Sequence, residues 1–315
     1  MVNPATAMYD ALIIGAGPAG LSTALGLARQ TYSAIVFDSQ KYRNSYASRM
    51  HNVITWDHKD PFEFRAAARE NIVSRYDTIR VEKATIESAT KKEDGTFELV
   101  DSEKNKYHGK KLVIATGVTD IFPQDIKGFG DVWGKLVFHC LFCHGYEERG
   151  VASAGVMAAG MLQAPPMVLH TARMASRLAQ KITIYTHGNE AYTAALQKEF
   201  EGKPLTIDAR KIVSMEKTGE NHLKMEFDDG EVVEHGFLVA VPDVKINGNF
   251  HEQLGLDIDP GAFIKVNPPF YETSVPGVFA VGDCATMVKA VPQAIAMGTF
   301  GAAGLVAQLG AMGKL

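Results

Sequence analysis

One short stretch near the N-terminus constrains the fold more than any other part of the sequence. Residues 9–14 (YDALII) form an apolar run typical of a buried strand, and the glycine-rich residues 15–20 (GAGPAG) follow at once. A helix of small residues is expected over 21–30, and a second apolar run at 33–37 ends in Asp38. This order predicts a β-turn-α-β unit with a G-x-G-x-x-G fingerprint at its first turn.

Each residue type in this unit has a physical reason to be there. The glycines allow a tight turn, a close approach of backbone to a pyrophosphate, and close packing of the helix on the strand. The helix N-terminus favours the phosphates, and Asp38 is suited to hydrogen-bond a ribose hydroxyl. A glycine-rich turn in an unrelated α/β protein is the less favoured alternative, because strand, helix and acid are in register. The sequence therefore predicts dinucleotide binding.

Composition narrows the class of protein. The chain has 315 residues, of which 46% are hydrophobic and 22% charged, so we expect a globular protein of two domains. Its formal net charge of −4 gives no basic face for nucleic acid or anionic lipid, and we expect neither as a partner. Residues 1–10 lack a basic segment and an apolar core, so no signal peptide is expected. No run is expected to approach the roughly 20 apolar residues of a membrane span. These features favour a cytoplasmic location.

The segment Cys140-Leu141-Phe142-Cys143-His144 permits three kinds of chemistry. It matches the pattern that attaches a c-type haem, it offers three ligands to zinc, and its C-x-x-C is a candidate redox dithiol. Haem attachment fits poorly, because that chemistry belongs to exported proteins. Zinc lacks a second C-x-x-C or histidine pair to complete its four ligands, so no metal site is predicted. The third cysteine, Cys284, is interpreted as a small buried residue.

Two further apolar strands end in recognisable residues. Residues 111–117 (KLVIATG) and 278–283 (VFAVGD) are predicted to be buried strands followed by turns, and an apolar, glycine-punctuated helix is expected over 292–309. This order of motifs, with the dithiol between them, resembles the low-molecular-weight thioredoxin reductase family over essentially the whole chain. The resemblance implies an α/β fold with two Rossmann-like domains, the second inserted in the first, and a homodimer.

The resemblance also implies domain boundaries and a cofactor. An FAD-binding domain is expected over 1–118 and 242–315, and an inserted domain carrying the dithiol over 119–241. The residues implied in FAD binding are Gly15, Gly17, Pro18, Ala19, Gly20, Asp38, Ser39, Arg43, Asn44, His51, Asn52, Ala84, Ala115, Thr116, Gly117, Gly282, Asp283, Gln293 and Ala294. Among these, Asp38 belongs to the ADP half, Gly282 and Asp283 to the ribityl and pyrophosphate side, and Gln293 and Ala294 to the flavin pyrimidine.

The inserted domain of this family has its own nucleotide fingerprint, which is expected to be degenerate here. Residues 151–160 (VASAGVMAAG) have glycine at the first and third fingerprint positions but Met157 in the middle. Pro165-Pro166 is expected to disrupt the following helix. Residues 186–190 (THGNE) contain no arginine for a 2′-phosphate. The sequence therefore predicts that NADPH does not bind to this domain.

The residue after the dithiol favours one activity. His144 stands where thioredoxin reductases usually have an acid, and its ordinary pKa near 6.5 suits a base that deprotonates an incoming thiol. The segment CLFCHGYE is similar to the C-x-x-C-H-G of the thioredoxin reductase-like dithiol oxidases, apart from Leu141 in place of a proline. These are the gliotoxin-oxidase type of fungi and their bacterial counterparts in holomycin and romidepsin pathways.

That similarity implies an FAD-dependent oxidase that closes a disulfide in a small-molecule dithiol and passes the electrons to O2, giving H2O2. Such enzymes act in secondary metabolite biosynthesis or self-resistance. By the same similarity, Cys140 exchanges with the substrate, Cys143 lies next to the flavin, and His144 acts as the base. The alternative is a thioredoxin-type disulfide reductase that uses NADPH, ferredoxin or another donor. A third interpretation is a catalytically silent flavoprotein or a metal-binding adaptor.

Overall fold

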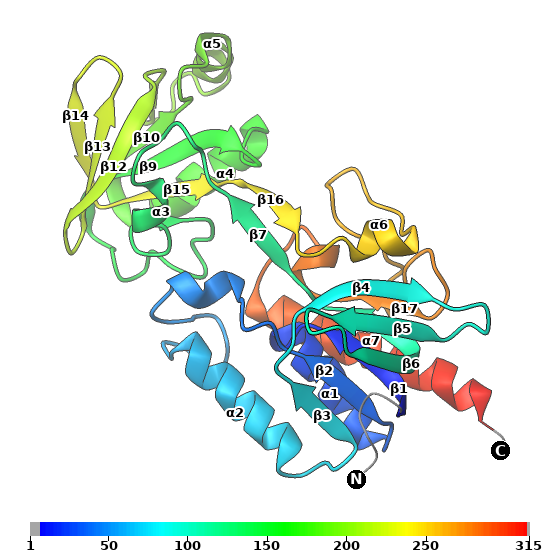
Figure 1. Ribbon diagram of the computed structural model, residues 1–315. Helices are drawn as coiled ribbons and strands as arrows, with labels where there is room; N and C mark the ends of the chain where they lie inside the picture. The colour runs from blue at the N-terminus through cyan, green and yellow to red at the C-terminus, as the bar shows by residue number, and fades with distance from the viewer. Residues whose placement is uncertain (1–6, 314–315) are drawn as a thin grey trace. The chain divides into compact units, whose positions relative to one another are not determined.

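The computed structural model describes residues 7–313, which form two compact units (Figure 1). Within the described residues, the first unit is 7–45, Val53–Thr119 and 245–313, and the second is Tyr46–Asn52 and Asp120–Val244. The segment Tyr46–Asn52, which was expected in the FAD domain, therefore belongs to the second unit. Residues 1–6, on which the expectation of no signal peptide partly rests, lie outside the described residues.

A seven-stranded sheet forms the centre of the first unit. Its strands, in spatial order, are β3 (Ile79–Glu82), β2 (Ala34–Phe37), β1 (Met8–Ile14), β6 (Lys106–Ile114), β5 (Phe97–Asp101) and β4 (Ile86–Lys91), with β17 (Val278–Ala280) also paired to β6. The central pairs from β3 to β6 and the β17 pair are parallel, and the β4–β5–β6 pairs are antiparallel. The apolar runs of β1, β2 and β17 are buried on both faces, which is typical of parallel strands.

The helices of the first unit begin where the sequence supplies suitable first residues. They are α1 (Pro18–Arg29), α2 (Pro61–Val73), α6 (Phe250–Leu254) and α7 (Val291–Met312), with the short 3-10 helix η2 (Asp283–Ala285). Another 3-10 helix, η1 (Arg43–Tyr46), ends at the first residue of the segment that belongs to the second unit. Pro18 and Pro61 stand in the first turn of their helices, where the missing N–H costs no hydrogen bond, and the Asp60 carboxylate accepts from Phe62 N at 2.6 Å. In Figure 1, α2 lies beside β3.

Glycines bring α1 and α7 into close contact. A Cβ atom at Gly298 would lie 2.2 Å from the Ala19 carbonyl oxygen, and one at Gly26 would lie 2.4 Å from the Ala302 Cβ. The glycines in the last predicted helix are therefore explained by the close packing of α7 on α1. Because α1 follows directly after Gly15 and Gly17 of the fingerprint, this contact joins the two ends of the chain in one unit.

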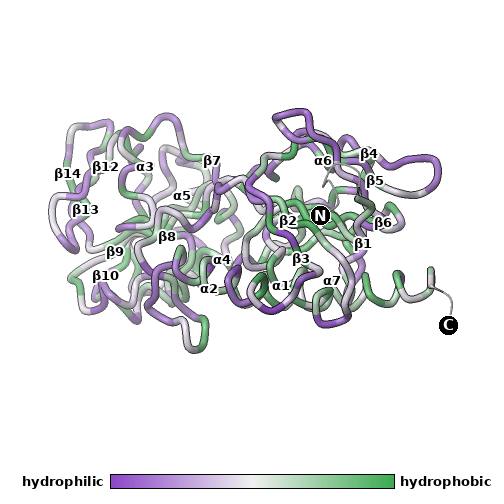
Figure 2. Tube along the Cα trace, turned by 60° about the horizontal axis from the view of Figure 1, so that its bottom comes forward, coloured by the Kyte–Doolittle hydropathy of each residue, from purple (hydrophilic) through white to green (hydrophobic). Residues whose placement is uncertain are grey.

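By length and composition, α7 is apolar enough to cross a membrane, so the expectation that no stretch approaches such a length is wrong. Figure 2 shows it as largely hydrophobic. Several of its side chains are nevertheless buried within the first unit, including Met297, Leu305 and Leu309. This is the environment of a core helix, which passes the same test of length and hydropathy.

The second unit is built on a five-stranded parallel sheet. Its strands, in spatial order, are β11 (Thr206–Asp208), β10 (Ala179–Tyr185), β9 (Val151–Gly160), β15 (Phe237–Val241) and β8 (Val137–Phe138). An antiparallel sheet of β12 (Ile212–Gly219), β13 (His222–Phe227) and β14 (Val232–His235) and the helices α3 (Phe129–Val132), α4 (Pro165–Ala175) and α5 (Glu190–Glu199) complete it. Strands β7 (Val118–Ile121) and β16 (Asp243–Ile246), where the chain passes between the units, pair with each other.

The second strand-to-helix turn lies five residues later than the sequence suggested. Met157 is buried within β9, and the turn begins at Gly160, whose φ of +62° favours glycine. Pro165 then stands in the first turn of α4 and does not disrupt that helix. The assignment of Met157 to the middle fingerprint position and the expected disruption at Pro165-Pro166 are therefore both wrong.

Candidate active site

The first glycine-rich turn has the geometry of a phosphate cradle. Gly15 has a φ of +115°, and a Cβ there would lie 2.3 Å from the Ala115 carbonyl oxygen. A Cβ at Gly20 would lie 1.9 Å from the Gly15 carbonyl oxygen, so Gly20 allows the close packing of α1 on this turn. At Gly17, the N-cap of α1, an added Cβ would meet nothing within 4 Å. The open space at this helix N-terminus fits the diphosphate of FAD.

Asp38 directly follows β2 and is buried among polar partners. Its carboxylate accepts hydrogen bonds from the Tyr42 hydroxyl at 2.6 and 2.7 Å and from Gln40 N at 2.8 Å, and it pairs with Arg69. Burial and the Asp38 carboxylate raise the pKa of Tyr42 to about 12, so its hydroxyl stays a donor at neutral pH. The sequence indicated Asp38 but gave no signal for Arg69, which lies on α2 and is 31 residues away.

The other predicted cofactor residues of the first unit come from both ends of the chain. Arg43 pairs with Asp283 at 3.3 Å, and a Cβ at Gly282 would lie 2.9 Å from the Ala19 Cβ. Ala84 N donates to the Asp38 carbonyl oxygen at 3.2 Å, which places it next to Asp38. The remaining predicted residues of this unit are Pro18, Ser39, Asn44, Thr116, Gly117, Gln293 and Ala294. His51 and Asn52 lie in the second unit, and their contact with FAD stays a prediction.

Cys140 and Cys143 form a disulfide directly after β8, and their Cα atoms are 5.3 Å apart. The Cys140 carbonyl oxygen accepts hydrogen bonds from Cys143 N at 3.2 Å and from His144 N at 3.1 Å, so the segment is a compact turn. Both cysteines are partly exposed. The prediction of a redox-active disulfide from these two residues is confirmed.

The His144 ring lies against the last residue of β8. It stacks on the Phe138 ring with centroids 5.1 Å apart and an interplanar angle of 17°. Burial, and secondarily the nearby His51, lower the pKa of His144 to about 4, although Glu147 opposes this. The imidazole is therefore neutral throughout the physiological pH range, below the pKa of 6.5 that an exposed histidine would have.

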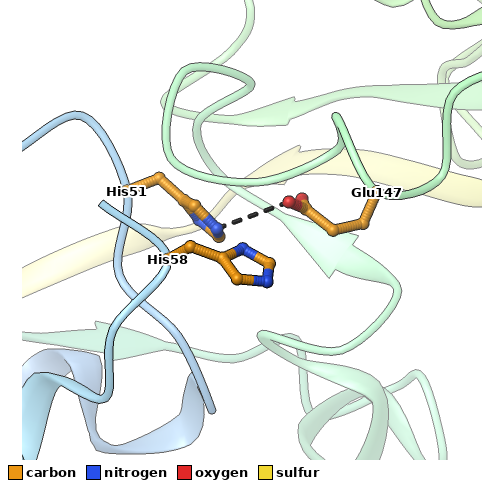
Figure 3. Close-up of side chains that lie close together, drawn as sticks. All are labelled: His51, His58 and Glu147. Atoms are coloured by element: carbon orange, nitrogen blue, oxygen red, sulfur yellow. Dashed lines mark ion pairs between the residues drawn. The ribbon is translucent and has the colours of Figure 1, made fainter. Parts of the chain in front are cut away.

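His51 reaches the dithiol from a segment far away in the sequence. Its Nδ1 lies 2.7 Å from the Cys143 carbonyl oxygen, and its Nε2 forms an ion pair of 3.4 Å with Glu147 Oε1 (Figure 3). Its ring meets the His144 ring edge to face, with centroids 6.0 Å apart. Sequence reasoning assigned His51 to the flavin, and no spacing signal connects it with Cys143 across 92 residues.

The other side chains near the dithiol, and the third cysteine, differ in how far they are exposed. His139, beside Cys140, stacks on the Trp133 ring with centroids 5.8 Å apart. Phe142 and Tyr146, within and just after the dithiol segment, are 69% and 63% exposed. The third cysteine, Cys284, is buried, and burial raises the pKa of its thiol to about 11, so it is an unreactive core residue as predicted.

Glu148 is a buried carboxyl group just beyond the dithiol turn. It is 9% exposed, and its Oε2 has no hydrogen-bond partner among the described residues. Burial, and then the neighbouring Glu147, raise the pKa of Glu148 above its ordinary value. A folded-state pKa above the unfolded one means that its contribution to stability is lost as the pH rises above about 4.3.

Glu148→Gln is therefore expected to stabilise the protein at pH 7, by about 1 kcal/mol or about 2 °C in Tm, and much less at pH 4. Thermal unfolding of both proteins at the two pH values measures this. Glu216→Gln on β12, where the side chain is exposed, is the matched control and should leave Tm unchanged. A lower Tm for Glu148→Gln at pH 7 would contradict the finding that Glu148 Oε2 has no hydrogen-bond partner among the described residues.

Comparisons with known proteins agree with this architecture. Residues 9–298 match the family described as pyridine nucleotide-disulphide oxidoreductase. The chain is 42% identical to thioredoxin reductase aclD of Aspergillus oryzae, over 97% of this chain and 98% of that protein. It is 44% identical to thioredoxin reductase tcpT of Claviceps purpurea, over 92% and 91%. A crystal structure of putative thioredoxin reductase TrxB from Bacillus anthracis superposes with a TM-score of 0.87 at 26% identity, over 96% of this chain and 99% of the other.

These matches confirm the predicted α/β fold and FAD as the cofactor, and the glycine turn of the first unit fits that cofactor. They also confirm that the chain is an oxidoreductase whose disulfide is Cys140–Cys143. The chain belongs to the pyridine nucleotide-disulphide oxidoreductase family, among the thioredoxin reductase-like flavoproteins.

Proposed function

We propose that this protein is an FAD-dependent dithiol oxidase, which forms an intramolecular disulfide in a small-molecule dithiol and reduces O2 to H2O2. The observation that carries the proposal is the pairing of a redox disulfide with a neutral imidazole in the next residue, His144. A reductase must protonate the thiolate that leaves its substrate, whereas an oxidase must deprotonate an incoming thiol. A neutral histidine offers the free lone pair that the second task needs, while the burial that keeps it neutral makes it a weaker base than an exposed histidine.

The reaction proceeds by thiol–disulfide exchange. His144 takes the proton of one substrate thiol, and the resulting thiolate attacks Cys140 Sγ, which breaks the Cys140–Cys143 bond and leaves Cys143 as a thiolate. The second substrate thiol then attacks the substrate sulfur of this mixed disulfide, which releases the cyclised product and Cys140. Bound FAD supplies the transfer of the electron pair from the protein dithiol to O2. The balance is one dithiol and one O2 giving one disulfide and one H2O2.

The turn of the second unit supports an enzyme that does not use NADPH. From Gly160 the chain continues through Met161, Leu162 and Gln163 to Ala164, the N-cap of α4. In the corresponding turn of the first unit, Ala16 is the only residue between Gly15 and Gly17, the N-cap of α1. The second turn is thus longer and has no glycine where backbone would approach a pyrophosphate. Residues 186–190, after β10, contain no arginine for a 2′-phosphate.

A second candidate function is a thioredoxin-type disulfide reductase. It is favoured by the similarity to aclD and tcpT, which are both called thioredoxin reductases. In that case the electrons would enter from NADPH, ferredoxin or another donor and leave to an oxidised dithiol. The same disulfide serves both directions, so the electron donor and acceptor distinguish the two functions.

The test compares the two donors under anaerobic conditions. Purified protein with its flavin is mixed with excess NADPH in one cuvette and with a small dithiol, such as dithiothreitol, in another. We expect the dithiol but not NADPH to bleach the flavin absorbance, and H2O2 to appear when air is admitted. Rapid bleaching by NADPH would show that the second turn still binds nucleotide and would favour the reductase.

The proposal includes the setting of the enzyme. We propose a cytoplasmic homodimer that acts on a sulfur-containing natural product in its biosynthesis or in self-resistance, because CLFCHGYE resembles the dithiol segment of such oxidases. The exposed ring of Phe142, which lies between the two cysteines in the sequence, offers an apolar surface to such a substrate.

A further inference from the structure

We propose that His51 and Glu147 are a positioning pair for the dithiol, which fixes the backbone of Cys143 and places a positive charge at the carbonyl group of that residue. This inference rests on the proposed function only for the expected change in dithiol turnover. The contacts from which it is argued all lie within the second unit. Neither residue lies in the C-x-x-C-H segment. His51 comes from the segment Tyr46–Asn52, and Glu147 follows the dithiol turn.

The positions of the protons on the His51 ring follow from which neighbouring atoms can donate and which can only accept a hydrogen bond. The Cys143 carbonyl oxygen can only accept, so His51 Nδ1, at 2.7 Å, carries a hydrogen and donates it. On the other side of the ring, Nε2 lies 3.4 Å from Glu147 Oε1, which also accepts when ionised. A lone pair on Nε2 would face the carboxylate unfavourably, so a proton lies between them. With both nitrogens protonated, His51 is a cation and Glu147 its counter-ion.

The contacts of this cation match the needs of the reaction. When the disulfide is reduced, a thiolate forms on Cys143, and a neighbouring cation stabilises a thiolate relative to the thiol. The hydrogen bond to the Cys143 carbonyl holds that residue while its sulfur changes partner. The His144 ring, with its centroid 6.0 Å from that of His51, would become a second cation if it were protonated. Repulsion between the two rings therefore keeps His144 neutral with its lone pair free, and it also makes this ring a weaker proton acceptor than an exposed histidine.

Burial makes this charge effective. The His51 side chain is only 13% exposed, while that of Glu147 is 38% exposed, so the cation is shielded from solvent and its counter-ion faces outward. Water screens such a charge less than it would screen one on the surface. The other acidic group on this turn, Glu148, lies buried next to Glu147. The Glu147 carboxylate thus pairs with the His51 nitrogen that faces away from Cys143.

The experiment measures the thiolate directly, separately from turnover. The holoenzyme is reduced with dithiothreitol, desalted without oxygen and alkylated with iodoacetamide across pH 5–10, and modification of each cysteine is followed by peptide mass spectrometry. His51→Asn can keep a donor to the Cys143 carbonyl but not the charge, and His51→Ala loses both. We expect the alkylation midpoint of Cys143 to rise by about one pH unit in both variants. Dithiol turnover is expected to fall about tenfold, and further in His51→Ala.

Two additional variants make the result decisive. Glu147→Gln removes the counter-ion from an exposed position and should raise the Cys143 midpoint in the same direction, whether or not the His51 variants fold. His222→Gln removes a comparable surface ion pair, 3.6 Å long, between His222 and Glu234 on the antiparallel sheet, and should change nothing. Retained flavin absorbance shows that each variant is folded.

An unchanged Cys143 midpoint in both Glu147→Gln and a folded His51 variant would overturn the inference. That outcome is distinct from failure of the proposed function, in which wild-type protein would not oxidise dithiols although its alkylation midpoint still depended on His51.

Discussion

Replacing Cys140 by serine is expected to lower kcat/KM for dithiol oxidation by at least about a thousandfold. Cys140 is the sulfur that the substrate thiolate attacks, and a serine oxygen cannot form the mixed disulfide. Because the two cysteines act as one redox unit, Cys143→Ser should be equally inactive. Oxygen consumption with a small dithiol measures both variants. Cys284→Ala, which changes the buried third cysteine, is the matched control and should keep its activity.

A trapping experiment separates the roles of the two cysteines. In Cys143→Ser, the free Cys140 thiolate can attack a cyclic disulfide such as oxidised dithiothreitol, forming a mixed disulfide and releasing one thiolate of the small molecule. We expect the mass of this variant to increase by one such molecule, while that of Cys140→Ser does not change. An adduct on Cys140→Ser and none on Cys143→Ser would reverse the assignment of the two sulfurs.

Replacing His144 by asparagine is expected to lower dithiol turnover by about 10²–10⁴-fold, the usual contribution of a general base. Asparagine is polar and of similar size but cannot accept a proton at any accessible pH. His139→Asn is the matched control, because His139 adjoins Cys140 but stacks on Trp133. It should retain most of the activity, with bound flavin and Tm showing that both variants are folded.

The pH profile gives a second test of His144. A base acts in its neutral form, and burial lowers the pKa of His144 to about 4, so the neutral form persists to more acidic pH. Wild-type turnover, measured with a dithiol at saturating concentration, should therefore not fall between pH 7.5 and 5.5 because of this residue. It should fall only as the pH approaches 4. A drop centred near 6.5 that persists in His144→Asn would identify another group as the base.

The first unit illustrates what local sequence can predict. The apolar runs, the GAGPAG turn and Asp38 are contiguous, and their physical roles depend on neighbours within about 30 residues. Parallel strands that are buried on both faces need continuous apolar runs, and a turn that approaches phosphate needs glycine. The β-turn-α-β unit could therefore be predicted element by element.

The second turn shows where a sequence pattern misleads. Gly155 and Gly160 suggested a fingerprint, but Gly155 lies inside β9, where a Cβ would come 2.5 Å from a Leu238 side-chain carbon. Its glycine serves strand packing, and the turn starts only at Gly160. The length of a buried strand is set by its partners β10 and β15, which are distant in sequence. Spacing alone therefore placed Met157 at the wrong position.

The sequence by itself determined the redox chemistry, because a C-x-x-C closes its disulfide across one turn and the histidine that follows is covalently tied to it. Only the tertiary structure decided the protonation of that histidine, which depends on burial against Phe138. It also decided that His51 lies at Cys143 and Arg69 at Asp38. Charge and burial act through space over a few ångströms, and separation along the chain does not encode such distances.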